Sequence, residues 1–396
     1  MDEHVVKTYK RAEPVFVRGE GASLFTEDGT EYLDFLGGIA VSALGHGHPE
    51  LVAALQDQAA QVLHVSNLFR HPFTEAVAER VTRLACMEEV FFCNSGTEAN
   101  EAALKIARKY HYQKGTGRTS FVALTGGFHG RTMGALSVTH KESFRAPFGP
   151  LAGDVTFVPR NDVPALQEAL GHKPCALILE PIQGECGVHP LSDEYLQECR
   201  RLCTASDTIL IHDEVQSGSG RTGLFLAAQH AGVTPDIATL AKPIAVGLPM
   251  GMTLVGHRTK NILEPGDHGS TFAGGPMACR AALVFLTELE EGGLQERVAA
   301  MGDHLTTALR GLSTVSDEVV EVRGRGLMQA IGLAPEIDAF QVQRHLFEEH
   351  LIVNATDAHT LRLLPAYVVT ESQIYRAVDR IRKGLESMTS TQGAKA

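Results

Sequence analysis

The sequence predicts an α/β fold in which an open, mostly parallel sheet carries helices on its faces, with a smaller α+β unit beside it. Between residues 90 and 256, short apolar runs alternate with segments of helical periodicity, a pattern typical of such a sheet. Polar residues follow several of these runs, as at Glu180 and Asp213. Since ligands of open α/β sheets bind beyond the carboxyl ends of the strands, we expect the functional site there.

The first part of the chain is predicted to form short strands and then helices. Apolar residues suited to strands occupy residues 15–17, 22–25 and 32–35, and Asp28-Gly29 is a turn signal between the last two. Helical spacing then covers residues 49–65 and 74–84. The loop between the strand at 32–35 and the helix at 49–65 contains His46 and His48. No nearby carboxylate or cysteine completes a usual metal-ligand set, so we expect no metal site.

A phosphate-binding turn is one of two interpretations of residues 94–101. A strand at 90–93 precedes this turn and a helical run at 102–112 follows it, which places the Gly96 and Thr97 amides at a helix N-terminus. Unpaired amides and the positive end of the helix dipole bind anions such as phosphate. A capped helix without a ligand fits this stretch equally well.

The remaining elements of the sheet unit follow in alternation. Strands are predicted at 121–124, 155–158, 176–179, 208–212, 236–240 and 252–256, and helices at 163–170 and 193–203. A loop at 126–132 holds Phe128, His129 and Arg131 among glycines.

The second unit is predicted to begin after a break at Gly292-Gly293, which separates helices at 276–289 and 294–312. Strands at 319–322, 327–333 and 361–364 and helices at 339–350 and 371–388 follow. We expect residues 1–49 to form an N-terminal segment of the small domain, 50–291 the large domain and 292–396 the C-terminal part of the small domain.

Composition excludes several classes of protein. The chain of 396 residues carries 35 Lys and Arg against 47 Asp and Glu, and its net charge of −12 argues against a general nucleic-acid binder. Seven cysteines without a C-x-x-C pair indicate reduced thiols rather than disulfides or zinc. The charged first residues and the lack of a run of about 18 apolar residues predict neither a signal peptide nor a membrane span. We therefore expect a cytoplasmic protein.

Lys242 is the leading candidate for a reactive group. It follows an apolar strand and precedes a segment rich in glycine and proline, residues 243–252. A lysine amine becomes nucleophilic toward carbonyl groups when burial or neighbouring charges lower its pKa. The ordinary alternative is a solvated surface lysine, so other motifs must support this role.

Those motifs resemble the class III, fold-type I pyridoxal-phosphate aminotransferases over nearly the whole chain. The similar pieces occur in the family's order at residues 38–46, 64–69, 95–101, 127–131, 180–185, 213–216, 219–223, 242 and 270–272. Each piece is weak alone, and their common order is a strong indication. The resemblance implies a large domain with a mostly parallel seven-stranded-type sheet flanked by helices, and a small α+β domain built from both termini.

The resemblance also implies pyridoxal 5'-phosphate as cofactor, held by Lys242 as a Schiff base. Asp213 would pair with the pyridine nitrogen, Gln216 with the ring hydroxyl, and Phe128 would stack on the ring. The other expected cofactor-binding residues are Ser95, Gly96, Thr97, Val215 and Thr271. Thr271 is expected to reach the phosphate of the other subunit, which implies a homodimer.

The reaction implied by the resemblance is transfer of a terminal amino group to 2-oxoglutarate, with N-acetylornithine as the leading donor. Arg362 would bind the 2-oxoglutarate α-carboxylate, Glu185 would cover that arginine while the donor is bound, and Arg131 and Ser270 would bind the donor's carboxylate end. The alternative donors are ornithine, succinylornithine, 4-aminobutyrate and a carrier-linked lysine precursor.

Three departures from the family's pattern lie near the expected pocket. Residues 243–247 read Pro-Ile-Ala-Val-Gly where the family has a more glycine-rich sequence, residues 271–276 replace the family's usual glycine-asparagine ending, and Cys186 stands where glycine is usual. These changes affect the choice of substrate rather than the cofactor ligands.

A nucleotide-binding protein on the same scaffold is the competing class, but the chain lacks a G-x-G-x-x-G turn after its first strand and a G-x-x-x-x-G-K-[ST] loop.

Overall fold

The computed structural model describes residues 4–393 and contains a seven-stranded sheet at its centre. In spatial order the strands are β4 (Glu89–Cys93), β12 (Gly251–Val255), β11 (Ile237–Leu240), β10 (Ile209–Asp213), β7 (Ala176–Leu179), β5 (Phe121–Leu124) and β6 (Val155–Val158). Strand β12 runs antiparallel to both of its neighbours, and the other pairs are parallel. The predicted fold class is therefore confirmed.

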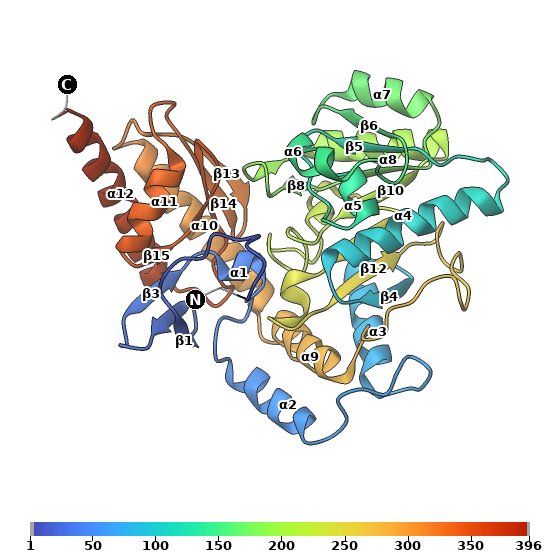
Figure 1. Cartoon of the computed structure of the whole chain (residues 1–396), viewed down its shortest axis with the longest axis horizontal. Coiled ribbons are helices and arrows are strands. Elements are labelled where there is room, and N and C mark those ends of the chain that lie inside the picture. Colours follow the sequence, from blue (N-terminus) through green and yellow to red (C-terminus); the bar gives the residue numbers. More distant parts are fainter. Residues whose placement is uncertain (1–3, 394–396) are drawn as a thin grey trace.

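Helices bury both faces of this sheet (Figure 1). Phe121 and Ala123 of β5 pack in one apolar cluster with α4 (Gly96–Gln113), whereas Val122 and Leu124 pack in another with α7 (Val163–Gly171) and α8 (Asp193–Ser206). Successive side chains of a strand point to opposite faces, so an apolar run is needed where both faces are covered.

The two ends of the chain meet beside the large sheet. The N-terminal strands β1 (Phe16–Glu20), β2 (Ser23–Thr26) and β3 (Glu31–Asp34) share a sheet with β15 (Leu351–Ile352), which pairs with β3 in parallel. A further sheet has the order β13 (Val319–Arg325), β14 (Met328–Leu333), β17 (Thr360–Leu363) and β16 (Asn354–Asp357). Helices α10 (Leu294–Ser313), α11 (Ala339–Glu348) and α12 (Glu371–Gly393) lie on the same side of the molecule (Figure 1).

Some predicted boundaries were wrong. Helix α2 spans Pro49–Ala59 and does not continue to residue 65. Val62 and Leu63, which extended the apolar pattern, are 46% and 57% exposed and therefore mark a surface segment rather than a buried helical face. Helix α11 ends at Glu348, before His350, which takes a φ of 60°. Helices α3 (Phe73–Ala85) and α9 (Pro276–Glu290) lie where helices were predicted.

Short elements with weak periodicity were not predicted. They are α1 (Gly37–Ala40), α5 (Met133–Ser137), α6 (Glu142–Arg145), β8 (Ile182–Gln183), β9 (His189–Pro190), β15, β16 and the 3₁₀ turns η1 (Ala146–Phe148) and η3 (Lys242–Ala245), whereas the turn η2 (Ala227–Ala231) lies where a short helix was expected after the loop that begins at Ser217. The seven cysteines are all free. Within residues 4–393, no helix combines the length and apolarity that a membrane crossing requires.

The sheet topology sets the place of the site. Glu180 follows β7, Asp213 ends β10, and Lys242 comes two residues after the end of β11. These three strands are parallel neighbours, so their carboxyl ends lie at one edge. The loop after β5, which carries Phe128 and Arg131, leaves the sheet at the same edge.

Candidate active site

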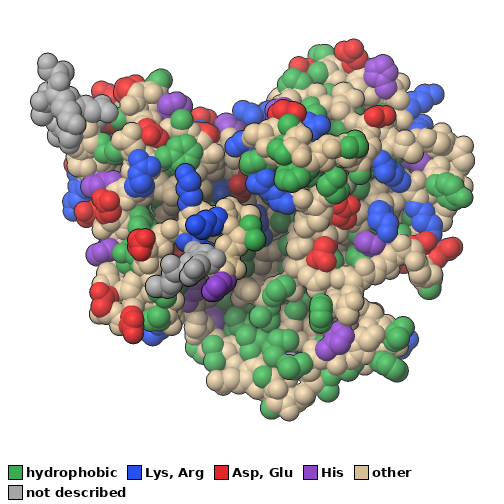
Figure 2. All heavy atoms as spheres, viewed as in Figure 1, with side chains coloured by type: hydrophobic (Ala, Val, Ile, Leu, Met, Phe, Trp, Pro, Cys, Tyr) green, Lys and Arg blue, Asp and Glu red, His purple; other side chains and the backbone are tan. Residues whose placement is uncertain are grey.

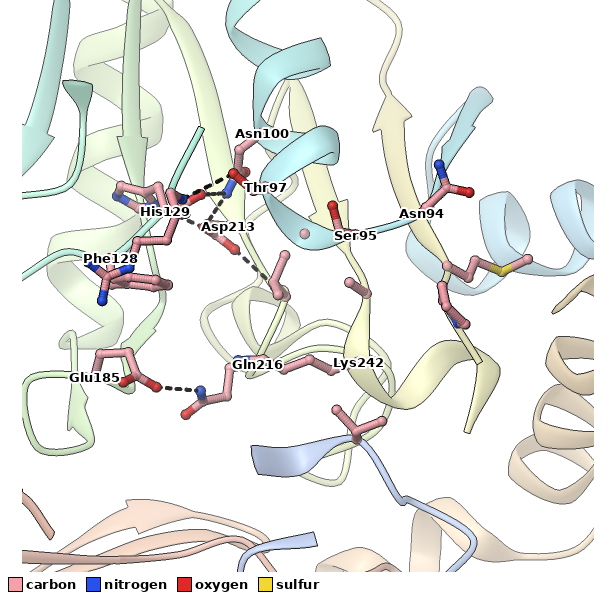
Figure 3. Close-up of a pocket in the computed structure, with 18 of the residues that line it drawn as sticks. Asn94, Ser95, Thr97, Asn100, Phe128, His129, Glu185, Asp213, Gln216 and Lys242 are labelled. Carbon is pink, nitrogen blue, oxygen red and sulfur yellow. Dashed lines mark hydrogen bonds and ion pairs between the residues drawn. The ribbon is translucent and has the colours of Figure 1, made fainter. Parts of the chain in front are cut away.

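A cavity of about 430 Å³ lies at this edge of the sheet. Figure 3 shows its labelled side chains arriving from the start of α4, from the loop after β5, from the segment after β8, from the end of β10 and from the turn after β11. Ten residues singled out from the sequence line the cavity: Ser95, Gly96, Thr97, Phe128, Arg131, Glu185, Asp213, Val215, Gln216 and Lys242.

The start of α4 forms a capped turn at the cavity wall. Ser95 is its N-cap, with an extended backbone and a side chain that accepts a hydrogen bond from the Glu98 amide. Glu98 in turn accepts from the Asn94 amide at 2.8 Å and from the Ser95 hydroxyl at 2.9 Å. The amides of Gly96 and Thr97 lie in the first turn of the helix, where an amide has no partner within the helix, and both residues line the cavity.

Glycine is required at position 96 because the chain passes close to Val215. A Cβ atom added to Gly96 would lie 2.6 Å from Val215 Cγ1, too near for any side chain. The beginning of the helix and the segment after β10 therefore pack closely together at the cavity wall.

Asp213 is held in a buried hydrogen-bond network. Its Oδ2 atom accepts from Asn100 Nδ2 at 2.7 Å and lies 2.8 Å from His129 Nδ1. Its Oδ1 atom accepts from the Val215 amide at 3.1 Å and from the Thr239 hydroxyl at 3.4 Å. Asp213 is only 4% exposed, so these contacts fix its orientation at the cavity wall (Figure 3).

Lys242 occupies the first position of η3 in a left-handed backbone conformation, with a φ of 50°. Such a φ is uncommon for a residue with a side chain, and it persists only where the surrounding structure enforces it. Burial lowers the pKa of the Lys242 amine, and the Glu185 carboxylate opposes that shift. A lowered pKa favours the neutral, nucleophilic amine.

Glu185 and Arg362 form an ion pair at the other side of the cavity, with 2.6 Å between Oε1 and Nη1. Arg362 also donates to the Gln216 side-chain oxygen at 3.1 Å and to the Gly184 carbonyl at 3.1 Å. Burial opposes ionisation of Glu185, but the charges of Arg362 and Lys242, together with hydrogen bonds from Arg362 and Gln216, outweigh it, so the pKa of this carboxyl lies below its usual value. Arg362 does not line the cavity itself; it is reached through Glu185.

Arg131 lines the cavity and is held by aromatic rings. Its guanidinium carbon lies 3.5 Å from the ring centre of Phe144 and 5.5 Å from that of Phe128. In residues 4–393 no carboxylate forms a salt bridge with Arg131, and the residue is exposed. The group is therefore available to an anionic ligand.

Ser270 and Thr271 lie outside the cavity of their own chain. The Ser270 hydroxyl accepts from Asn94 Nδ2 at 2.7 Å, and its carbonyl accepts from Asn67 Nδ2 at 3.0 Å. Thr271 is exposed. Within one chain, the loop that carries Ser270 and Thr271 is therefore hydrogen-bonded to the segment before α4, but neither residue lines the cavity of that chain.

Several residues that contribute to the site were not singled out as site residues from the sequence: Asn94, Asn100, His129, Phe144, Glu180 and Thr239. His129 lies next to Phe128 in the loop at 126–132, and this position was the one feature of the sequence that could have indicated its role. Asn100 and Thr239 act through contacts with residues far along the chain, which a local pattern does not reveal.

These groups match what pyridoxal phosphate requires. A helix N-terminus is suited to its phosphate, a fixed carboxylate to its ring nitrogen, an aromatic side chain to its ring and an amine of lowered pKa to its aldehyde. The fold and the donor set together define an enzyme that uses this cofactor.

Comparison with known proteins identifies the family. Residues 6–385 match the family model described as Aminotransferase class-III, and the chain belongs to this family. It is 42% identical over 392 residues to an acetylornithine aminotransferase of Methanopyrus kandleri, covering 98% of each chain.

Solved structures agree with this assignment. An ornithine aminotransferase from Toxoplasma gondii ME49 is similar with a TM-score of 0.93 and 32% identity, over 98% of this chain and 94% of that one. An amine transaminase from an uncultivated Pseudomonas species, solved in its PLP-bound form, has a TM-score of 0.92 and 28% identity, over 98% and 99% of the two chains.

Proposed function

We propose that the enzyme transfers the terminal amino group of N-acetylornithine to 2-oxoglutarate, giving N-acetylglutamate 5-semialdehyde and glutamate, a step of arginine biosynthesis. The observation that carries the proposal is the pairing of one covered arginine, Arg362, with one open arginine, Arg131, around a single cavity. The names of close relatives, which are acetylornithine aminotransferases at about 40% identity, support the choice of donor.

Pyridoxal phosphate, when bound, supplies an aldehyde that links to amines and a ring that withdraws electrons from the adjacent carbon. In our proposal, Ser95, Gly96 and Thr97 bind the phosphate at the start of α4. Val215 and Phe128 would enclose the two faces of the ring, and Gln216 would donate to its hydroxyl.

Lys242 and Asp213 are the proposed catalytic residues. The Nζ atom of Lys242 would move a proton to and from the substrate carbon, as a general base and acid. Its lowered pKa favours the neutral form of the amine. Asp213, oriented by Asn100 and His129, would hold the ring nitrogen of the cofactor and favour its protonated form by its negative charge.

The two arginines would serve two substrates with different geometry. While N-acetylornithine is bound, its α-carboxylate pairs with Arg131, and Glu185 neutralises Arg362. When 2-oxoglutarate replaces the first product, its α-carboxylate pairs with Arg362 and Glu185 turns away. While Glu185 covers Arg362, this arginine cannot bind the α-carboxylate of the donor. The donor therefore cannot present its α-amine, and the cavity selects the terminal amine.

We also propose a homodimer in which Ser270 and Thr271 of one subunit reach the cavity of the other. Exposed apolar side chains support a subunit contact, among them Val52, Leu63, Leu68, Phe69 and Phe272. Figure 2 shows hydrophobic side chains gathered over the lower part of this face, where α2 and α9 lie in Figure 1. Apolar surface of this kind is typical of stable interfaces.

The domain boundaries form part of the same proposal: 1–49 and 292–396 for a small domain, and 50–291 for a large cofactor-binding domain. The parallel pairing of β3 with β15 supports joining the two terminal segments. The free cysteines support a reducing compartment, and we place the enzyme in the cytoplasm.

The test is a screen of single half-reactions. The cofactor-loaded enzyme is mixed with one amine at a time, and conversion of the cofactor to its amine form is followed by absorbance. N-acetylornithine should react with the highest kcat/KM, ahead of ornithine, succinylornithine and 4-aminobutyrate. A negligible rate with N-acetylornithine beside rapid reaction of another amine would replace the donor and leave the transaminase itself in place.

A further inference from the structure

Glu180 is a buried carboxylate that contacts two separate loops of the site. It follows β7 at the edge of the sheet, lines the cavity and is only 6% exposed. Its Oε1 atom accepts from the Phe128 amide at 2.8 Å, and its Oε2 atom accepts from the Gly184 amide at 3.2 Å. One side chain therefore fixes the backbone beneath the aromatic ring and the backbone directly before Glu185.

The Gly184 peptide is held from both sides. Its amide donates to Glu180, and its carbonyl accepts from Arg362 Nη1 at 3.1 Å. A neighbouring contact reinforces the link between the loops, since Gln183 Nε2 donates to the Thr125 carbonyl at 2.9 Å. Because the peptide before Glu185 is fixed, this residue can leave Arg362 by rotation about its side-chain bonds.

We infer that Glu180 is a positioning residue that holds the Phe128 loop and the base of the Glu185 gate in one frame, so that exchange of substrates moves the Glu185 side chain and not the backbone. The inference rests on the proposed function, because the gate has a purpose only when two carboxylate substrates alternate.

The chemistry of the contact explains why a carboxylate is needed. Both oxygens must accept from amides, which an ionised carboxylate does and a side-chain amide does with one oxygen only. Burial raises the pKa of Glu180 to about 7, an effect that His129 opposes and Asp213 supports. The two amide donors favour the ionised form against this burial.

Amide hydrogen exchange tests the inference directly, because it needs neither substrate nor turnover. Exchange at Phe128 and Gly184 is measured by mass spectrometry with fragmentation to single residues, with and without cofactor. In Glu180→Gln, the amide that faces the new NH₂ group should exchange roughly tenfold faster than in the wild type, as expected for loss of a charge-assisted hydrogen bond. Glu180→Asp, which is shorter, should release at least one amide despite keeping its charge.

Glu214→Gln is the matched control. Glu214 is also fully buried and its pKa is also raised to about 7 by burial, but it accepts from Ser217 and from the Ala228 amide and does not line the cavity. General loosening of the fold would accelerate exchange in both variants. Faster exchange at Phe128 or Gly184 in the Glu180 variants alone supports the inference, whereas unchanged protection or equal loss in Glu214→Gln overturns it.

A kinetic readout separates positioning from mere stability. The rate of the half-reaction with glutamate, divided by the rate with N-acetylornithine, should change at least about fivefold in Glu180→Gln and stay at the wild-type value in Glu214→Gln. An unchanged ratio in Glu180→Gln overturns the link to the gate. If N-acetylornithine proves not to be a substrate, the proposed function fails, but the exchange result still decides the position of the two loops.

Discussion

The guanidinium of Arg362 and the carboxylate of Glu185 form an ion pair with 2.6 Å between Nη1 and Oε1. The arginine side chain is 1% exposed and the glutamate side chain 38% exposed. A buried charge without a partner is strongly unfavourable, so a second carboxylate must take the place of Glu185 whenever it leaves. The α-carboxylate of 2-oxoglutarate is the group that the proposed reaction supplies.

Replacing Glu185 with glutamine should weaken the discrimination between terminal and α-amines. Without its covering charge, Arg362 attracts the α-carboxylate of any amino acid in both half-reactions. We expect the half-reaction rate with glutamate relative to N-acetylornithine to rise about tenfold, which corresponds to roughly 1.4 kcal/mol of lost discrimination. Stopped-flow absorbance measures both rates.

Glu194→Gln serves as the control, since it makes the same chemical change at an exposed position on α8. An unaltered ratio of rates in Glu185→Gln would show that this carboxylate does not act as the gate.

Phe144→Leu should weaken binding of the amine donor while leaving 2-oxoglutarate unaffected. The Phe144 ring lies 3.5 Å from the guanidinium carbon of Arg131, and a cation–π contact at an exposed site contributes about 0.5–1 kcal/mol. KM for N-acetylornithine should therefore rise roughly two- to fivefold. Steady-state kinetics with each substrate varied in turn measures the difference.

Phe148→Leu is the matched change, because Phe148 is 57% exposed in the adjoining η1 turn. Equal shifts in KM for both substrates of Phe144→Leu would contradict a role specific to Arg131.

The contribution of Glu214 to the free energy of unfolding should decrease as pH rises. Burial raises its pKa to about 7 in the folded protein, above its ordinary value of 4.5. Between these values the folded state binds more protons than the unfolded state, so stability is highest below pH 4.5 and declines until pH passes 7. Glu214→Gln removes this dependence.

The stability of Glu214→Gln relative to the wild type should therefore increase from pH 5 to pH 8, by on the order of 2–3 kcal/mol. Urea unfolding at the two pH values measures the change. A constant difference, or a variant that loses ground at pH 8, would show that the buried carboxyl does not titrate in this range.

The sequence predicted the elements that depend on local pattern. Apolar runs such as 176–179 are recognisable because both faces of a central strand are buried, and the strand, turn and helix around Gly96 are recognisable from neighbouring residues alone. The resemblance to the class III family then supplied the residues that line the cavity.

Other features depend on residues that meet only after folding. Asp213 is oriented by Asn100, which lies 113 positions earlier, and by His129, which lies 84 positions earlier. The contact of Phe144 with Arg131 arises from the short helix α6, whose four residues carry too little periodicity to be predicted. Helix α2 was predicted too long because exposed apolar residues follow it without a strong stop signal.

The identity of the reactive lysine is the central claim, and chemical fixation of the cofactor tests it most directly. The loaded enzyme is reduced with borohydride, digested and mapped by mass spectrometry, with Lys242→Ala treated in parallel. We expect the pyridoxyl mass to be attached to Lys242 alone, and we expect Lys242→Ala to carry no such adduct and to lose transamination by at least about a hundredfold. An adduct on another lysine in the wild type, or normal turnover by Lys242→Ala, would contradict it.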